Sequence, residues 1–135
     1  MSRLLRTIAA LVALASTAAL ADTQVWDYIS YKRDRTSGQF MKDLGNAGTL
    51  ELIESDGKAR FRIVAGRLDA CYRGEIPATV ERTAETTTIT MVEAISGCPM
   101  FRYVIRNDGS GGQKQMLKDG AWVNEHFDHG LTPHK

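Results

Sequence analysis

Residues 49–66 constrain the fold of this chain more than any other stretch. They read TLELIES, then Asp56-Gly57, then KARFRIVAG. An Asp-Gly pair between two alternating runs is typical of a tight β-hairpin, because both turn residues adopt positive φ angles. In the second run Phe61 and Ile63 alternate with arginines, as on a strand with one buried face. A chain organised around such hairpins is expected to be all-β.

The rest of the chain repeats this pattern of short strands and turns. Further runs rich in β-branched or aromatic residues lie at 25–31, 68–73, 78–82, 86–92, 100–107, 113–118 and 121–127. Strands at a spacing of about 8–12 residues favour a small barrel or sandwich. We predict an all-β antiparallel meander barrel of about seven or eight strands. The alternatives are a β-sandwich and an α+β fold with one short helix near 34–45, inside the predicted loop 32–48. The tail GLTPHK is expected to be irregular.

The first 21 residues have the layout of a secretory signal peptide. Arg3 and Arg6 precede an uncharged apolar stretch at 8–20, and Ala19-Leu20-Ala21 provides the small residues of a cleavage site. The apolar stretch is shorter than the roughly 20 residues of a membrane-spanning helix. We therefore predict a signal peptide at 1–21 and one β-rich domain at 22–135, without a membrane anchor, in the periplasm or secreted.

The charge of the predicted mature chain limits its partners. Cleavage after Ala21 removes two arginines and no acidic residue, which leaves 15 basic and 16 acidic side chains. Proteins that bind nucleic acid or anionic membranes through general electrostatics carry a clear basic excess. We expect no nucleic-acid partner.

Cys71 and Cys98 are the only cysteines, and an exported protein meets an oxidising compartment. A redox-active or metal-binding pair favours a Cys-x-x-Cys spacing, which is absent here. We predict one structural disulfide, Cys71–Cys98.

Two strands with aromatic inner faces present arginines outward. Strand alternation places four guanidinium groups on the outer face, from Arg60, Arg62, Arg102 and Arg106. Arginine holds carboxylate or phosphate bidentately. If the two strands are neighbours, the four groups form a stripe that binds an anionic partner. The alternative is a solvated face with arginines paired to Glu51, Glu81 or Glu93.

All three histidines lie near the C-terminus, in NEHFDHGLTPH. His126, Asp128 and His129 are spaced to share a divalent ion, and zinc or copper are the metals that suit this ligand set. The alternatives are a solvated chain end with one structural hydrogen bond and an acid–base role. The chain needs no cofactor under either alternative.

No catalytic motif is present: the Gly109-Ser110-Gly111-Gly112 run lies between predicted strands, whereas phosphate-binding loops precede a helix. The chain is expected to be a non-enzymatic binding protein that acts through a surface face or barrel mouth on a protein or a small anionic ligand. Its architecture, without a shared motif, resembles the periplasmic lysozyme-inhibitor and protease-inhibitor families, which implies inhibitor-like binding. A small periplasmic metal-binding protein is the alternative, and a small hydrolase comes third.

Overall fold

The computed structural model describes residues 21–66, 68, 70–125 and 129–135. Residues 1–20 of the predicted signal peptide lie outside this range, as do His126 and Asp128 of the predicted metal cluster. Within the described residues, no helix is long and apolar enough to cross a membrane.

The described chain forms nine strands and one short 3-10 helix, which runs from Ala70 to Tyr72 and is labelled η1. The strands are β1 (Asp22–Arg33), β2 (Phe40–Ser55), β3 (Lys58–Val64), β4 (Ile76–Arg82), β5 (Thr86–Met91), β6 (Phe101–Arg106), β7 (Gly112–Lys118), β8 (Ala121–Asn124) and β9 (Gly130–Pro133).

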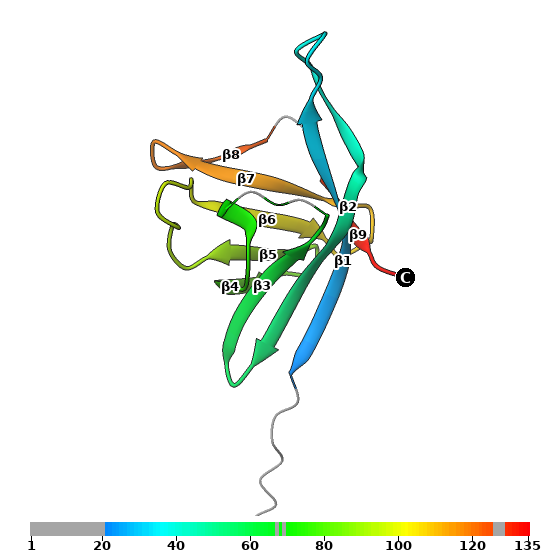
Figure 1. Ribbon diagram of the computed structural model, residues 1–135. Helices are drawn as coiled ribbons and strands as arrows, with labels where there is room; N and C mark the ends of the chain where they lie inside the picture. Colours follow the sequence, from blue (N-terminus) through cyan, green and yellow to red (C-terminus); the bar gives the residue numbers. More distant parts are fainter. Residues whose placement is uncertain (1–20, 67, 69, 126–128) are drawn as a thin grey trace, which may run out of the picture.

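All nine strands belong to one antiparallel sheet in the order β8-β7-β6-β5-β4-β3-β2-β1-β9. The sheet curls strongly, as Figure 1 shows, but β8 and β9 do not pair within the described residues, so its hydrogen-bonded ladder stays open. The predicted all-β antiparallel meander is confirmed, with nine strands where seven or eight were expected. There is a single sheet and no helix at 34–45.

The predicted hairpins are present where turn chemistry and alternation agree. Asp56 and Gly57 have φ of 53° and 71° and connect β2 to β3. Phe61 and Ile63 on β3 are buried. The same alternation on β6 buries its aromatic and aliphatic residues, and the core contains Trp26, Tyr28, Leu50, Leu52, Phe61, Ile63, Ile76, Ala78, Ile89, Met91, Phe101, Tyr103, Ile105 and Leu131. These side chains line the concave face of the sheet.

Three segments differ from expectation. The predicted loop 32–48 instead continues β1 and β2 into a long ribbon. The predicted strand 68–73 contains η1. The predicted irregular tail contains β9, which pairs with β1 from Trp26 to Tyr28. The ribbon is extended because β1 and β2 pair with each other, and the tail is a strand because it pairs with the distant β1.

Two glycines allow the chain at the start of β7 to pack closely against β9 and β6. An added Cβ at Gly111 would lie 2.8 Å from the Gly130 carbonyl oxygen, and one at Gly112 would lie 3.2 Å from Leu131 Cδ1. A side chain at Gly111 would push this segment away from β9, because real Cβ atoms do not approach backbone oxygen so closely. At Gly112 the closest atom is the Val104 carbonyl oxygen, 2.6 Å away, so a side chain there would first push β7 away from β6.

Candidate functional site

The four predicted binding arginines do not form one stripe. Arg60 and Arg62 lie on β3, whereas Arg102 and Arg106 lie on β6, and β4 and β5 separate these strands. Three strand spacings amount to about 14 Å along the sheet, more than the Debye length of about 10 Å at 0.1 M salt. The condition for a stripe, that the two strands are neighbours, is not met, because β4 and β5 form their own hairpin between them.

Each of these arginines also has a local partner. Arg60 Nε lies 2.7 Å from Glu75 Oε2, Arg62 pairs with Glu51, Arg102 Nε donates to Gln115 Oε1 at 2.7 Å, and Arg106 Nε donates to Ser110 Oγ at 2.7 Å. The predicted pairing with Glu51 is therefore present. Binding of an anion by these four residues stays a prediction.

Of the predicted metal cluster, only His129 lies among the described residues. Its ring is buried, with Nε2 2.6 Å from Glu125 Oε2 and Nδ1 3.2 Å from the Ile29 carbonyl oxygen. The described residues contain no group of three or more His, Cys, Asp or Glu side chains that could hold a metal ion. The proposed sharing of a metal with His126 and Asp128 stays a prediction.

The structure instead draws attention to a projecting ribbon at residues 30–45, which we call the arm. It contains the end of β1, a turn and the start of β2, and it extends well beyond the curled sheet, here called the body (Figure 1). In the described residues β9 pairs with β1 only up to Tyr28, and β3 pairs with β2 only from Thr49 onward. The arm is therefore two strands wide, with both edges open.

The arm exposes large apolar side chains. Leu44 is 75% exposed, Phe40 51% and Met41 48%. Scattered single apolar residues on a surface need no explanation, but a cluster on a projecting element marks an interaction site. The three residues lie within one five-residue stretch of β2.

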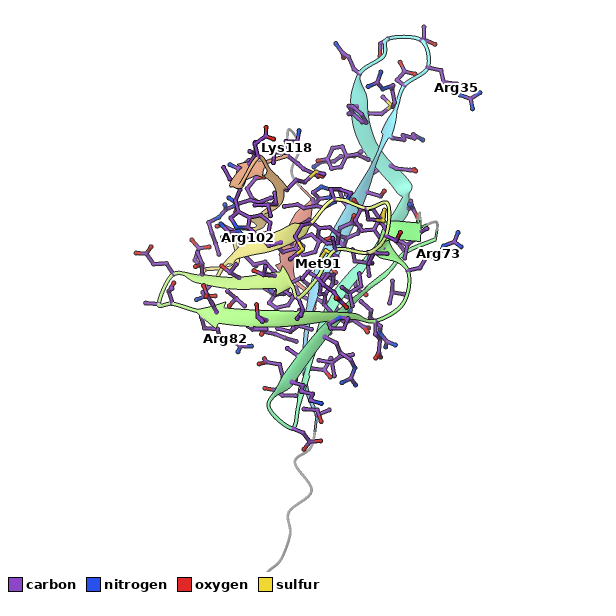
Figure 2. The ribbon with its side chains drawn as sticks, turned by 90° about the vertical axis from the view of Figure 1, so that its left-hand side faces the viewer. Arg35, Arg73, Arg82, Met91, Arg102 and Lys118 are labelled. Carbon is purple, nitrogen blue, oxygen red and sulfur yellow. A yellow bond between two sulfur atoms is a disulfide. The ribbon has the colours of Figure 1, made fainter. Side chains whose placement is uncertain are left out.

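The arm is also basic. It carries Lys32, Arg33, Arg35 and Lys42 against Asp34 and Asp43. Lys32 Nζ lies 3.6 Å from Asp43 Oδ1, and Ser37 donates two hydrogen bonds to Asp34, which lower the pKa of that carboxyl and shape the turn. Both carboxylates are thus engaged inside the arm. Figure 2 shows Arg35 at the tip, pointing away from the body.

A buried ionic network lies at the base of the arm. Lys114 on β7 is 1% exposed, and its Nζ is 3.2 Å from Glu125 Oε1. Glu125 in turn contacts His129, just before β9. These side chains connect β7 and the residue after β8 to the residue before β9, so ionic contacts link the two edges of the sheet where the backbone ladder is open.

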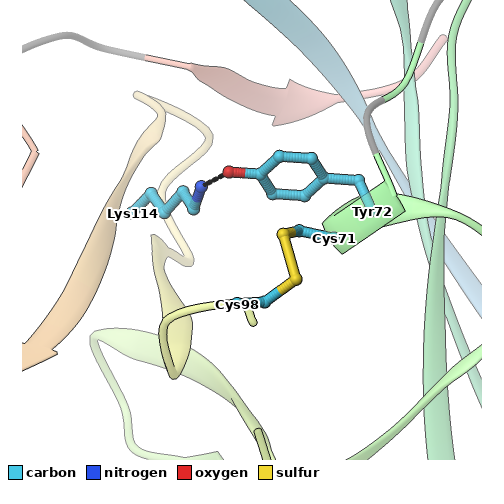
Figure 3. Close-up of a disulfide and its surroundings, with 4 residues drawn as sticks. All are labelled: Cys71, Tyr72, Cys98 and Lys114. Carbon is cyan, nitrogen blue, oxygen red and sulfur yellow. Dashed lines mark hydrogen bonds between the residues drawn. A yellow bond between two sulfur atoms is a disulfide. The ribbon is translucent and has the colours of Figure 1, made fainter. Parts of the chain in front are cut away.

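Aromatic rings and the disulfide enclose the lysine. Its Nζ lies 4.3 Å from the Tyr72 ring centroid and 4.7 Å from that of Phe101, and it donates a hydrogen bond to the Tyr72 hydroxyl (Figure 3). The adjacent Cys71 forms the predicted disulfide with Cys98, with Cα atoms 5.7 Å apart. The disulfide therefore fixes η1, which presents Tyr72 to the lysine.

The network keeps Glu125 ionised. Burial opposes its ionisation, but the hydrogen bond to His129 and the charge of Lys114 outweigh that cost, so the pKa of Glu125 is lowered. Both His129 ring nitrogens face oxygens, Nε2 that of the Glu125 carboxylate and Nδ1 that of the Ile29 carbonyl.

His129 links this network to the arm. Its ring stacks on Tyr28, with centroids 5.5 Å apart, and meets the edge of Tyr31 at 5.6 Å. Tyr31 is the second residue of the arm. On the other strand, an added Cβ at Gly48 would lie 1.7 Å from the Val64 carbonyl oxygen, so only glycine fits where β2 leaves β3. The base of the arm is thus held on both strands.

Chemically, the network is suited to holding structure. A substrate could reach Lys114 Nζ only by displacing two rings and a carboxylate. No family model, curated protein or solved structure matches the chain. We therefore infer function from the contacts of the arm and the body.

Sequence reasoning missed both the arm and the network. The alternation in β7 places Lys114 between Gly112 and Met116 on the inward face, and a lysine at an inward position predicts a buried partner. The sequence could therefore have predicted that Lys114 is buried with a partner. It could not have predicted which residue is the partner, because Glu125 lies on a different segment.

Proposed function

We propose that this chain is an exported, non-enzymatic binding protein that inserts its arm into an acidic, partly apolar cleft of a partner protein, in the periplasm or outside the cell. The observation that carries the proposal is the exposure of Phe40, Met41 and Leu44 on a ribbon that leaves the body. Burial of such side chains in a partner is the main favourable contribution to most protein–protein association.

The charge of the arm favours an acidic partner. The arm has two more basic than acidic residues, whereas the predicted mature chain has one more acidic than basic residue. Arg33 packs over Phe40, with its guanidinium carbon 5.0 Å from the ring centroid. Apolar and cationic groups are therefore presented together, and complementary charge accelerates association and excludes neutral or basic surfaces.

Two features of the chain support export. The stretch 1–21 has the layout of a secretory signal. The Cys71–Cys98 disulfide is compatible with an oxidising compartment. A projecting element that occupies a cleft is also the geometry by which inhibitor-like proteins act, and a rigidly anchored base reduces the entropy lost on binding.

Affinity capture from periplasmic extract with the immobilised mature protein tests this proposal. A captured partner is then measured against a Phe40→Ser, Leu44→Ser double variant. We expect its affinity to fall at least about tenfold, as for central apolar contacts of an interface. The matched control is Val64→Ser, Val92→Ser, which removes two similarly exposed apolar side chains from the body.

Salt and charge reversal test the acidic cleft. Raising the salt concentration and the substitution Arg35→Glu should both slow association of the captured partner. A partner that binds the arm double variant as tightly as the original protein would contradict the proposal. So would a partner whose affinity falls equally in the body control.

A further inference from the structure

A pocket lies on the body, at the start of β1 and away from the arm. Its volume is about 370 Å³, and its lining includes Gln24, Trp26, Arg82, Thr87, Arg106 and Asn107. Small-molecule sites begin at about 300 Å³, so this pocket has room for a small ligand with one ring. Figure 2 shows Arg82 on the β4–β5 hairpin, far from Arg35 at the tip of the arm.

The polar wall of this pocket is held in place by its own hydrogen bonds. The buried Thr87 hydroxyl donates to Asn107 Oδ1 at 2.8 Å, and Asn107 Nδ2 donates to the Thr83 carbonyl oxygen at 2.9 Å. The β4–β5 turn is thereby tied to the end of β6. Trp26, which is almost fully buried, provides an apolar wall from β1.

Arginines supply the charge of the lining. Arg82 and Arg106 are both lining residues, and no carboxylate is among the described residues of the lining. Ser110 engages two donors of Arg106, its Nε and Nη2, through Oγ and the carbonyl oxygen. A guanidinium has five N–H donors, so these contacts orient Arg106 and leave donors for an anion.

Arg82 already shows the recognition that such a pocket would use. Its Nη1 donates to Glu54 Oε2 at 3.2 Å and its Nη2 donates to Glu54 Oε1, which is a two-point contact with a carboxylate. Gln24 Oε1 lies 3.5 Å from Nη2. The pairing with Glu54 holds the guanidinium at the pocket edge, and a ligand carboxylate would meet the N–H donors that Glu54 and Gln24 leave.

We propose that this pocket binds a small monocarboxylate with one apolar ring. The carboxylate lies between Arg82 and Arg106, and the ring packs against Trp26. This site is separate from the arm and goes beyond the proposed function of the arm, since the two share no residue.

Benzoate is the probe for this site, and the indole N–H signals in nitrogen-15 NMR spectra of the mature protein are the readout. The chain has two tryptophans, so Trp122→Phe assigns the Trp26 signal. We expect that signal to shift saturably with benzoate, with a dissociation constant on the order of 0.1–1 mM for so small a ligand. Benzyl alcohol, which keeps the ring and lacks the charge, should bind at least about tenfold more weakly.

Variants separate the pocket from general effects. Arg106 is the exposed last residue of β6. The substitution Arg106→Gln should weaken benzoate binding about tenfold or more, since it removes one of two charged contacts. Arg82→Gln should do the same, with circular dichroism to confirm that the variant is folded. Arg60→Gln, which removes an arginine paired with Glu75 outside the pocket, should leave binding unchanged.

The arm variant Phe40→Ser, Leu44→Ser should bind benzoate as tightly as the original protein does. The arm proposal and the pocket proposal can therefore fail independently of each other. The proposal is wrong if the Trp26 signal does not saturate, if benzyl alcohol binds as well as benzoate, or if Arg106→Gln retains full affinity. Equal binding of phosphate with no shift of the Trp26 signal would also overturn it, because the ring contact would then play no part.

Discussion

The two halves of β2 have the same backbone geometry and opposite surroundings. In the body, Leu50 and Leu52 are completely buried, whereas Leu44 in the arm is 75% exposed. The body half is paired on both sides, to β1 and β3, and the arm half only to β1. One strand is thus exposed in the arm and then becomes part of the core in the body.

This difference shows where the stability of the domain resides. A two-stranded ribbon with no covered face is marginally stable in water, so the arm depends on its attachment to the body. That attachment consists of the Tyr31–His129 contact and the Lys114–Glu125–His129 network. The boundary between arm and body is therefore expected to be more sensitive to substitution than the arm itself.

The largest effect is expected at that boundary. Glu125→Gln leaves the charge of Lys114 buried without its carboxylate, which costs about 3–5 kcal/mol of unfolding free energy. Denaturant titration measures the loss. Glu54→Gln is the matched control, because the Glu54–Arg82 pair is more exposed and contributes less than about 1 kcal/mol. Equal losses in the two variants would remove the special role of the boundary.

The same truncation on the two halves of β2 should give different results. Leu52→Ala creates a cavity in the core and should cost about 2–5 kcal/mol. Leu44→Ala in the arm should change the unfolding free energy by less than about 0.5 kcal/mol. Thermal or urea unfolding of both variants provides the measurement, and a large loss for Leu44→Ala would mean that the arm is covered in solution.

Removing the disulfide should weaken the body. Cys98→Ser, made together with Cys71→Ser, should lower the unfolding free energy by about 2–4 kcal/mol, since the disulfide closes a long loop of the unfolded chain. Urea unfolding of the oxidised original and of the double variant tests this. An unchanged midpoint would show that η1 and Tyr72 are held without the disulfide.

The smallest effect concerns pH. The pKa of Glu125 is lower in the folded state than in the unfolded chain, so its contribution is fully present above the ordinary glutamate pKa of about 4.3. The contribution is lost as the pH falls from that value through the folded-state pKa. Unfolding measured between neutral and acidic pH should show this loss in the original protein, and Glu125→Gln should show a smaller one.

The parts of the fold that follow from local sequence were predictable. Asp56-Gly57 specifies a turn, and the alternation around Phe61 and Phe101 specifies buried faces. The sequence predicts a loop at 32–48 because Gly38, Gly45 and Gly48 interrupt the alternation there, whereas the structure pairs β1 with β2 through most of this stretch. The short β9 is a strand only because β1 lies beside it, and its four residues include a glycine and a proline.

The candidate sites were less predictable than the fold. Arg60 and Arg102 were correctly placed on outward faces, but their separation depends on the order of strands in the sheet. The pocket beside Trp26 gathers residues from β1, the β4–β5 turn and the end of β6. Such combinations of distant segments have no signature in one sequence.

The pairing of β9 with β1 has a consequence for how the domain folds. These strands lie near opposite ends of the described chain, and Asp27 pairs with Thr132. Closing so long a loop is entropically costly, whereas the β4–β5 hairpin closes across a few residues. We expect the hairpins to form first and the first and last strands to join late. Pulse-labelled hydrogen exchange during refolding should then protect the Glu81 amide, which faces β5, before that of Ile29.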